Sequence, residues 1–218
     1  MSQSKTDTKA DALVYRYHDG LYVNFTNRCP TACRFCIKFT WKMRYRSYDL
    51  KLNGHEPSTA EVLAAIDSAG RERAFDEIVF CGYGESTYRL ADMLAVCEEL
   101  KRRYPHARRR LNTIGLGNLI NGRSIAAELA RGLDSVSVSL NTADPRQWVE
   151  MHNPLEPFAK DGFESVKQFI RECAAVIGDT AVTAVQREGV DLDACRRLAE
   201  SLGACWRERP YLDDYEAK

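Results

Sequence analysis

The chain has 218 residues, and its 31 lysines and arginines balance its 31 aspartates and glutamates. This length suits one domain with a substantial core, and the balanced charge excludes an overall field that would recruit nucleic acid or a membrane surface. No apolar run approaches the roughly 18 residues of a spanning helix, and the opening MSQSKTDTKAD lacks the apolar core of a signal peptide. We therefore expect a cytoplasmic protein whose eight cysteines are thiols or metal ligands, not a disulfide framework.

Short β-rich runs alternate along the chain with longer segments of helical spacing. The predicted strands are residues 21–26, 77–81, 110–114, 134–140, 180–186 and 204–209. The predicted helices are residues 58–70, 88–103, 123–132, 162–177 and 192–203. Residues 1–12 and 212–218 are interpreted as tails, so the predicted domain spans residues 13–211.

Ser58 and Glu61 form the S-x-x-E pattern of a capping box at the start of the first helix. Strand–helix units in series make a parallel sheet with right-handed crossovers. Six such units are too few for the usual eight-stranded closed barrel, so an open partial barrel and a doubly wound sheet remain. In either fold, ligands bind at the carboxyl ends of the strands.

Cys29, Cys33 and Cys36 lie in the loop that follows the first predicted strand, at that carboxyl edge. A structural zinc site usually takes four ligands as two close pairs, and no second pair accompanies Cys33 and Cys36. The other five cysteines are scattered, several in helix or strand interiors where a lone cysteine is usually an apolar filler. Three thiolates in one loop also suit an iron–sulfur cluster with one iron left open for a chelating ligand.

The spacing Cx₃CxΦC, with Phe35 directly before Cys36, resembles the signature of the radical S-adenosylmethionine (SAM) superfamily. The resemblance implies a 4Fe-4S cluster held by Cys29, Cys33 and Cys36, whose open iron takes the amino and carboxylate groups of SAM. It implies reductive cleavage of SAM to a 5′-deoxyadenosyl radical that abstracts a hydrogen atom from a substrate. Phe35 is the expected adenine contact.

The segment CGYGEST, residues 81–87, follows the second predicted strand. Glycines allow close backbone approach to a ligand, and the Glu85 carboxylate can accept from an ammonium group. The segment resembles the GGEP segment of the superfamily, which binds the methionine amino group, so Gly82, Tyr83, Gly84 and Glu85 become candidate SAM contacts. Tyr83 replaces the second glycine of that pattern and Ser86 its proline. The alternative interpretation is an ordinary glycine-rich βα turn.

The fourth predicted strand, SVSVSLN, alternates so that Ser137, Ser139 and Asn141 share one face. A buried parallel strand should be apolar on both faces, so these polar side chains predict a hydrated or ligand-filled interior. The family resemblance places SAM-binding residues at the end of this strand. Further candidates for the same pocket are Asn112 and Thr113 on the third strand, and Val185 and Gln186 on the fifth.

The segments CRFCIKFTW, YDLKLNGHEPS, FCGYGEST, SVSLN and RERPY are most similar to the TatD-associated radical SAM family. That family is named for being encoded beside TatD-type metal-dependent hydrolases, and the name assigns no reaction. The resemblance covers residues 21–211 and implies a (β/α)₆ partial TIM-type barrel in a single domain. We expect one cluster, no accessory cofactor domain, and a functional link to a TatD-type hydrolase.

The predicted function is that of an oxygen-sensitive radical SAM enzyme, whose catalytic side chains, substrate and net reaction the sequence does not name. Expected partners are an external one-electron reductant of flavodoxin or ferredoxin type and a small-molecule or protein substrate, with no nucleic acid and no membrane. The alternative is a non-catalytic iron–sulfur or zinc protein that senses or binds a partner. The polar face of the fourth strand counts against it, because a sensor needs no nucleoside pocket.

Three further features have open or default interpretations. The loop of residues 41–57 either covers the substrate or closes one end of the barrel. Arg207, Arg209 and Tyr211 either hold an anionic substrate or pair with carboxylates. The four histidines show no metal-binding spacing, so we expect a surface or capping role for each.

Overall fold

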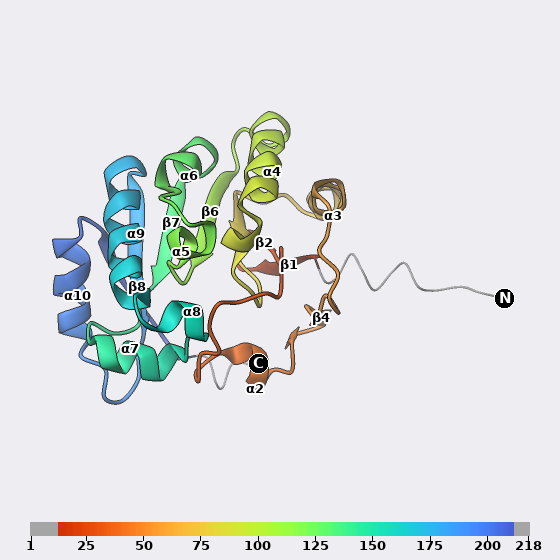
Figure 1. The fold of residues 1–218 in the computed structure, drawn as a ribbon. Coiled ribbons are helices and arrows are strands. Elements are labelled where there is room, and N and C mark those ends of the chain that lie inside the picture. Colours follow the sequence, from red (N-terminus) through yellow and green to blue (C-terminus); the bar gives the residue numbers. More distant parts are fainter. Residues whose placement is uncertain (1–12, 212–218) are drawn as a thin grey trace.

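The computed structural model describes residues 13–211, so both predicted tails lie outside the described residues. Seven strands form one sheet in the order β1-β2-β5-β6-β7-β8-β9, with the helices arranged around it (Figure 1). The strands are β1 (Val14–Tyr17), β2 (Gly20–Val23), β5 (Glu77–Phe80), β6 (Arg108–Thr113), β7 (Ser135–Ser139), β8 (Asp179–Val185) and β9 (Cys205–Arg209).

Strands β2 and β5 to β9 run parallel, and only β1 is antiparallel to its neighbour β2. The parallel strands lie in the sheet in their order along the chain, without the reversal that marks a doubly wound fold. The sheet is therefore a partial barrel of six parallel strands, as predicted. The antiparallel strand β1 was not predicted, although the two residues His18 and Asp19 that join it to β2 form a two-residue turn between alternating runs, which is a hairpin signal.

The crossover connections contain the five predicted helices and several short ones. After β2 come α2 (Ile37–Thr40), the hairpin strands β3 (Arg44–Tyr45) and β4 (Tyr48–Asp49), and α3 (Thr59–Glu72). The next connections hold η1 (Ser86–Arg89) with α4 (Leu90–Arg103), and α5 (Gly117–Asn121) with α6 (Ala126–Gly132). The connection between β7 and β8 contains α7 (Pro145–His152), α8 (Glu156–Ala159) and α9 (Gly162–Val176). The connection between β8 and β9 contains α10 (Leu192–Ser201). Of the helices between residues 13 and 211, none combines the length and hydrophobicity needed to cross a membrane.

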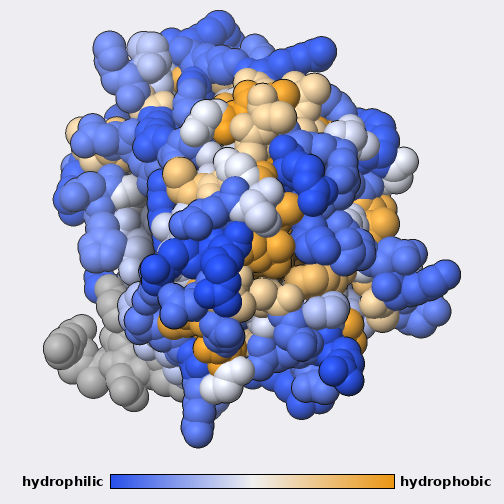
Figure 2. All heavy atoms as spheres, turned by 90° about the vertical axis from the view of Figure 1, so that its left-hand side faces the viewer, coloured by the Kyte–Doolittle hydropathy of each residue, from blue (hydrophilic) through white to orange (hydrophobic). Residues whose placement is uncertain are grey.

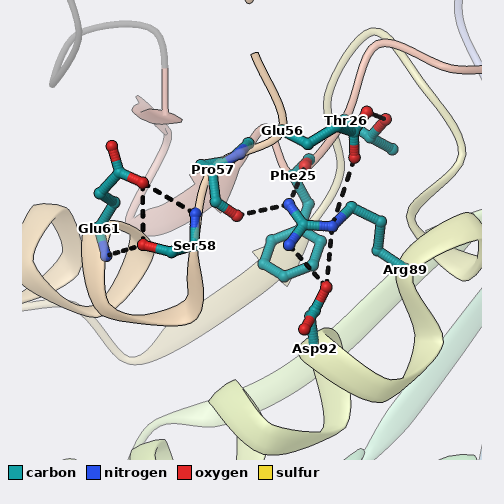
Figure 3. Close-up of polar contacts among 8 residues, drawn as sticks. All are labelled: Phe25, Thr26, Glu56, Pro57, Ser58, Glu61, Arg89 and Asp92. Atoms are coloured by element: carbon teal, nitrogen blue, oxygen red, sulfur yellow. Dashed lines mark hydrogen bonds and ion pairs between the residues drawn. The ribbon is translucent and has the colours of Figure 1, made fainter.

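The predicted capping box is present at the start of α3 (Figure 3). The Ser58 hydroxyl accepts from the Glu61 backbone N–H at 3.2 Å, and the Glu61 carboxylate accepts from the Ser58 N–H at 2.9 Å. Two amides that the first helical turn would leave unpaired are thus satisfied.

The register of the sheet separates an apolar outer face from a polar inner face. Leu111, Val136 and Val182 point outward and are fully buried against the helices. On the inner face, Asn112 is paired with Ser137, Ser139 with Thr183, and Val185 with Arg209. Paired positions on neighbouring strands point to the same side of a sheet. The polar face predicted for residues 134–140 therefore continues across four strands, and the hydrophobic core lies outside the sheet.

The segment of residues 41–57 closes part of the inner side. Trp41, Tyr45 and Leu50 from this segment pack in a small hydrophobic cluster with Tyr15 and Tyr83. The Tyr83 hydroxyl donates to the Arg44 carbonyl at 2.6 Å, which ties the β3–β4 hairpin to the loop after β5.

The barrel remains open at β9, the edge strand that follows α10. Its side chains are mostly exposed, and three of its five residues, Arg207, Glu208 and Arg209, are charged. Charged edge strands resist pairing with other chains. Figure 2 shows the α10 side of the molecule, where hydrophilic residues surround a smaller group of hydrophobic ones.

Candidate functional site

Two adjoining cavities lie on the inner side of the sheet, one at the carboxyl ends of the parallel strands and one beside it along the strands. The first, of about 240 Å³, is lined by Cys29, Cys33 and Cys36, and we call it the cysteine cavity. The second, of about 330 Å³, is lined by five tyrosines, and we call it the tyrosine cavity. Cys81 and Ser139 line both cavities, so a ligand in one would contact a ligand in the other.

The β2–α2 loop brings the three predicted metal ligands to one cavity. The Thr31 hydroxyl lies 3.5 Å from the Cys29 sulfur and 3.2 Å from the Cys33 sulfur. All eight cysteines of the chain are free, and Cys97 and Cys173 are fully buried in the hydrophobic core, as expected of filler residues. The three predicted ligands thus line one cavity, which Cys81 from the turn after β5 also borders.

Burial disfavours the ionised form of two of these thiols. Burial raises the pKa of Cys33 to about 12, against the lowering effect of the Thr31 hydroxyl, and burial also raises the pKa of Cys36. A metal must therefore displace thiol protons to bind. Among residues 13–211, no three His, Cys, Asp or Glu side chains converge as ligands of one metal ion.

Arg89 anchors the start of the β2–α2 loop from outside the cavity (Figure 3). Its guanidinium lies 4.6 Å from the centroid of the Phe25 ring and donates to the Pro57 carbonyl at 2.5 Å. It also forms ion pairs with Asp92 at 2.6 Å and Glu56 at 3.3 Å. One buried cation thereby joins the end of β2, the segment before α3 and the first turn of α4.

The network continues from Glu56 into the residues before the first cysteine. The Glu56 carboxylate accepts from the Thr26 hydroxyl at 2.8 Å, and that hydroxyl accepts from the Arg28 N–H at 3.0 Å. The Arg28 carbonyl accepts from the Glu85 N–H at 2.7 Å. The loop that presents Cys29 is therefore fixed to the turn after β5.

The glycines of that turn are required by packing within the protein. A Cβ atom on Gly82 would lie 2.1 Å from the Asn24 Oδ1, and one on Gly84 would lie 2.2 Å from the Thr26 carbonyl oxygen. Neither position tolerates a side chain, because the backbone after β2 passes directly alongside. Both glycines also line the cysteine cavity.

The Glu85 carboxylate is engaged by four protein donors. Its Oε1 accepts from the N–H and the hydroxyl of Thr87 at 3.1 and 2.8 Å, and its Oε2 accepts from the Thr113 hydroxyl and the Ile114 N–H, both at 2.9 Å. Burial raises the pKa of Glu85, and these hydrogen bonds oppose that shift. A carboxylate has about four lone-pair sites, so this one is largely occupied in joining β5 to β6.

The structure brings most of the predicted SAM contacts to the cysteine cavity. Its lining includes Phe35, Gly82, Tyr83, Gly84, Glu85, Asn112, Thr113, Ser139, Asn141 and Val185. Ser137 lines only the tyrosine cavity. Gln186 lines neither of these two cavities, and its side-chain amide donates to Glu208 at 3.1 Å.

His152 lines the cysteine cavity and was not predicted there. The expected surface or capping role is wrong for this residue, because its side chain is fully buried at the end of α7. Its Nδ1 lies 3.0 Å from the Trp148 carbonyl oxygen and its Nε2 lies 3.0 Å from the Asn141 amide nitrogen, which places the single proton on Nδ1. Burial lowers the pKa of His152 to about 4. The sequence did contain a signal for this burial, because Trp148 and His152 are four residues apart and therefore share one face of an amphipathic helix.

Cys81 and Tyr15 were also missed as site residues. Cys81, expected as a filler, is half-buried at the boundary of the two cavities. Tyr15 lies beside it and donates from its hydroxyl to the Cys81 carbonyl at 3.1 Å. It was missed because β1 was not predicted.

The family model described as the Radical SAM superfamily matches residues 23–202 of the chain. A radical SAM methyltransferase from Sphaerobacter thermophilus has a similar structure, with a TM-score of 0.64 and 17% identity over 90% of this chain and 57% of that one. The radical S-adenosylmethionine methyltransferase TsrM from Kitasatospora setae, solved with cobalamin and a 4Fe-4S cluster, gives a TM-score of 0.55 and 16% identity over 84% of this chain and 35% of that one. The chain thus spans 57% and 35% of the lengths of these structures, and at such identities the similarity shows the fold alone. No curated protein sequence matches the chain.

Proposed function

Because the chain belongs to the radical SAM superfamily, we propose that Cys29, Cys33 and Cys36 hold a 4Fe-4S cluster and that SAM occupies the rest of the cysteine cavity. Members of this superfamily are enzymes whose cofactors are a 4Fe-4S cluster and SAM, and this membership confirms the predicted enzyme status over a non-catalytic sensor. The observation that supports the residue assignment is that three thiols of one loop line a single cavity together with the Gly82–Glu85 turn.

The chain's own residues would orient SAM in this cavity. The side-chain hydroxyl of Ser139 and the Nδ2 of Asn112 have no hydrogen-bond partner among residues 13–211, so both are available to a ribose or a carboxylate. Phe35 packs edge-on against His152, with 5.4 Å between ring centroids, and would offer a ring face to adenine. Since the Glu85 carboxylate is occupied, we assign the methionine amino group to the backbone carbonyls of the Gly82–Glu85 turn.

The bound cofactors would supply an electron and a 5′-deoxyadenosyl radical, which abstracts a hydrogen atom from the substrate. The protein contributes position and the exclusion of water. The buried residues Trp41, Tyr45, Leu50 and Tyr83 form a hydrophobic cluster that lines one side of the tyrosine cavity.

The assignment to the TatD-associated subgroup remains part of this proposal and rests on the segments CRFCIKFTW, FCGYGEST and RERPY. It includes a functional link to a TatD-type hydrolase and a cytoplasmic location. The external reductant that radical SAM enzymes generally need would here be of flavodoxin or ferredoxin type.

Electron paramagnetic resonance of the anaerobically reconstituted, reduced protein tests the proposal. SAM should change the spectrum of the cluster, because its amino and carboxylate groups would occupy the open iron. An unchanged spectrum at saturating SAM would show that the cysteine cavity does not bring SAM to the metal.

A further inference from the structure

The tyrosine cavity adjoins the proposed cofactor site and shares only part of its lining with it. We propose that this cavity is the substrate site, and that it binds a small molecule with an aromatic ring and one anionic group. The inference rests on the proposed function, because the neighbouring cysteine cavity must hold SAM for the cavity to be a substrate site.

The cavity exists because the inner face of the barrel has small side chains at its centre. Ser137 is paired with Ala181, and Ser139 with Thr183, at positions that large residues usually fill in a barrel interior. The resulting volume of about 330 Å³ lies at the lower end of the range for small-molecule pockets. This volume favours a small molecule, one of the two predicted substrate classes.

One wall of the cavity is aromatic. It consists of Tyr15, Tyr17, Tyr22, Trp41, Tyr45 and Tyr83. The Tyr15 hydroxyl donates to the Cys81 carbonyl at 3.1 Å, and the Tyr22 hydroxyl accepts from Arg110 at 3.2 Å. Since both hydroxyls contact other protein groups, the wall presents mainly rings to a ligand, and such a wall favours an aromatic partner.

The facing wall offers unpaired hydroxyl groups. Ser137 is only 6% exposed and lines the cavity, yet its hydroxyl has no hydrogen-bond partner among the described residues. The Ser139 hydroxyl is in the same situation at the boundary with the cysteine cavity. Both hydroxyls border the cavity without a hydrogen-bond partner among residues 13–211, so they can donate to or accept from a polar group or a water beside the ring.

The charges of the cavity leave one cation without a counter-ion. Arg110 forms an ion pair with Glu77 at 2.7 Å, and Arg207 forms one with Asp179 at 2.9 Å. Arg209 lines both cavities and has no ion pair within residues 13–211. Its guanidinium is the group that would bind a carboxylate or a phosphate of the substrate.

The carboxylate in the described lining does not neutralise Arg209. Glu208 accepts from the Gln186 amide at 3.1 Å and lies 3.8 Å from the Arg196 guanidinium. Glu208 borders the tyrosine cavity, but its carboxylate is engaged by these two residues and forms no ion pair with Arg209 among residues 13–211. The anion of the ligand would thus meet an unopposed positive charge.

The lining residues on β7 indicate where the substrate and SAM would lie along this strand. Asn141 lines the cysteine cavity, Ser139 lines both cavities, and Ser137 lines only the tyrosine cavity. A substrate held near Ser137 would therefore lie directly beside SAM held near Ser139.

Titration calorimetry on the full-length, anaerobically reconstituted protein with SAM tests the inference. The probes are 4-hydroxyphenylacetate, its neutral amide, phenyl phosphate and hexanoate. The aromatic anions should bind saturably, with the amide and hexanoate each at least about tenfold weaker, because each lacks one of the two recognised features. Comparison of the affinities for 4-hydroxyphenylacetate and phenyl phosphate shows which anion the site prefers.

Matched variants locate the binding. Arg209→Gln should abolish the discrimination between the carboxylate and its amide, whereas Arg171→Gln on the exposed face of α9 should preserve it. Ser137→Ala should weaken the aromatic carboxylate and leave SAM affinity unchanged, because Ser137 lines only the tyrosine cavity.

Equal affinity for the amide and the carboxylate, or no binding of any aromatic anion, would overturn the inference. So would a loss of SAM affinity in Arg209→Gln with probe binding intact, since the cation would then serve the cofactor. A reconstituted protein that binds no SAM would instead refute the proposed function. The same titrations therefore distinguish a failure of the inference from a failure of the proposed function.

Discussion

The side-chain amide of Asn141 and the imidazole of His152 lie 3.0 Å apart, and both are buried at the edge of the cysteine cavity. Asn141 adopts a left-handed backbone conformation with φ 66°, and its Oδ1 accepts from the Val185 N–H at 3.2 Å. Together these contacts join the end of β7 to α7 and to the end of β8. They fix the wall of the cavity beside the residues proposed to bind SAM.

His152 should make stability depend on pH below neutrality. An unfolded histidine binds a proton with a pKa near 6.5, but His152 in the folded chain binds one with a pKa of about 4. Unfolding therefore takes up a proton between these values, and stability is lost as pH falls from about 7 to 4, by about 3 kcal/mol from this residue.

Urea unfolding of the wild type and of His152→Asn at several pH values measures this contribution. The variant should be less stable at pH 7.5 but should lose less stability on acidification. The exposed His106→Asn should retain the wild-type slope. Parallel pH slopes for the wild type and His152→Asn would contradict a neutral, buried His152.

The three cysteines of the β2–α2 loop should be indispensable for the cluster. Cys29→Ala, Cys33→Ala and Cys36→Ala should each reduce the iron and sulfide of reconstituted protein from about four of each to near zero. The exposed Cys205→Ala should keep full iron content, and so should the buried Cys97→Ala, at some cost in stability. Iron and sulfide assays make the comparison, and stoichiometric zinc without iron uptake would reject the cluster.

Arg89 should stabilise the cysteine loop although it lies outside the cavity. Arg89→Met keeps the stem but removes the cation that faces Glu56 and Asp92. Breaking a fully buried ion pair costs about 3–5 kcal/mol, and the partly exposed carboxylates here suggest about 2–3 kcal/mol. Cluster content after reconstitution should fall as well.

The matched control for Arg89 is Arg123→Met, which removes a more exposed ion pair to Glu128. It should change stability by no more than about 0.5 kcal/mol. If both variants unfold at the same urea concentration and load the same amount of iron, Arg89 does not anchor the loop.

Glu85→Gln should destabilise the fold more than it weakens SAM binding. The glutamine amide would place an N–H₂ group against donors such as the Thr87 or Ile114 N–H, and leaving them unpaired costs about 1–3 kcal/mol. The exposed Glu98→Gln is the control for the same chemical change. A variant of wild-type stability that no longer binds SAM would mean that the carboxylate serves the ligand.

The sequence predicted the features of this site that depend on local spacing. The gaps between Cys29, Cys33 and Cys36 and the alternation of Ser137, Ser139 and Asn141 are periodic patterns within one loop and one strand. In the structure the three cysteines line one cavity, and Ser137 and Ser139 line the other, whereas Asn141 lies beyond the end of β7 and lines only the cysteine cavity. The six parallel strands were predicted for the same reason, because each helix or strand has its own periodicity.

Contacts between distant segments could not be predicted in this way. The ion pair of Arg89 with Glu56 and its stacking on Phe25 join residues far apart in the chain. Which cavity Ser137 faces depends on how the strands are staggered, and that stagger is set by the packing of the whole barrel. The burial of His152 depends on the docking of α7, which the chain after β7 does not reveal by itself.

The central claim is that the cysteine cavity brings SAM to a reducible cluster, and the most direct test is SAM cleavage in the absence of substrate. Reconstituted, reduced protein should slowly convert SAM to equal amounts of 5′-deoxyadenosine and methionine. Cys36→Ala should form neither product, and Ser139→Val should form less nucleoside at unchanged iron content, because Ser139 is proposed to bind SAM and not metal. A protein with a full, reducible cluster that yields no 5′-deoxyadenosine under any reductant would contradict the claim.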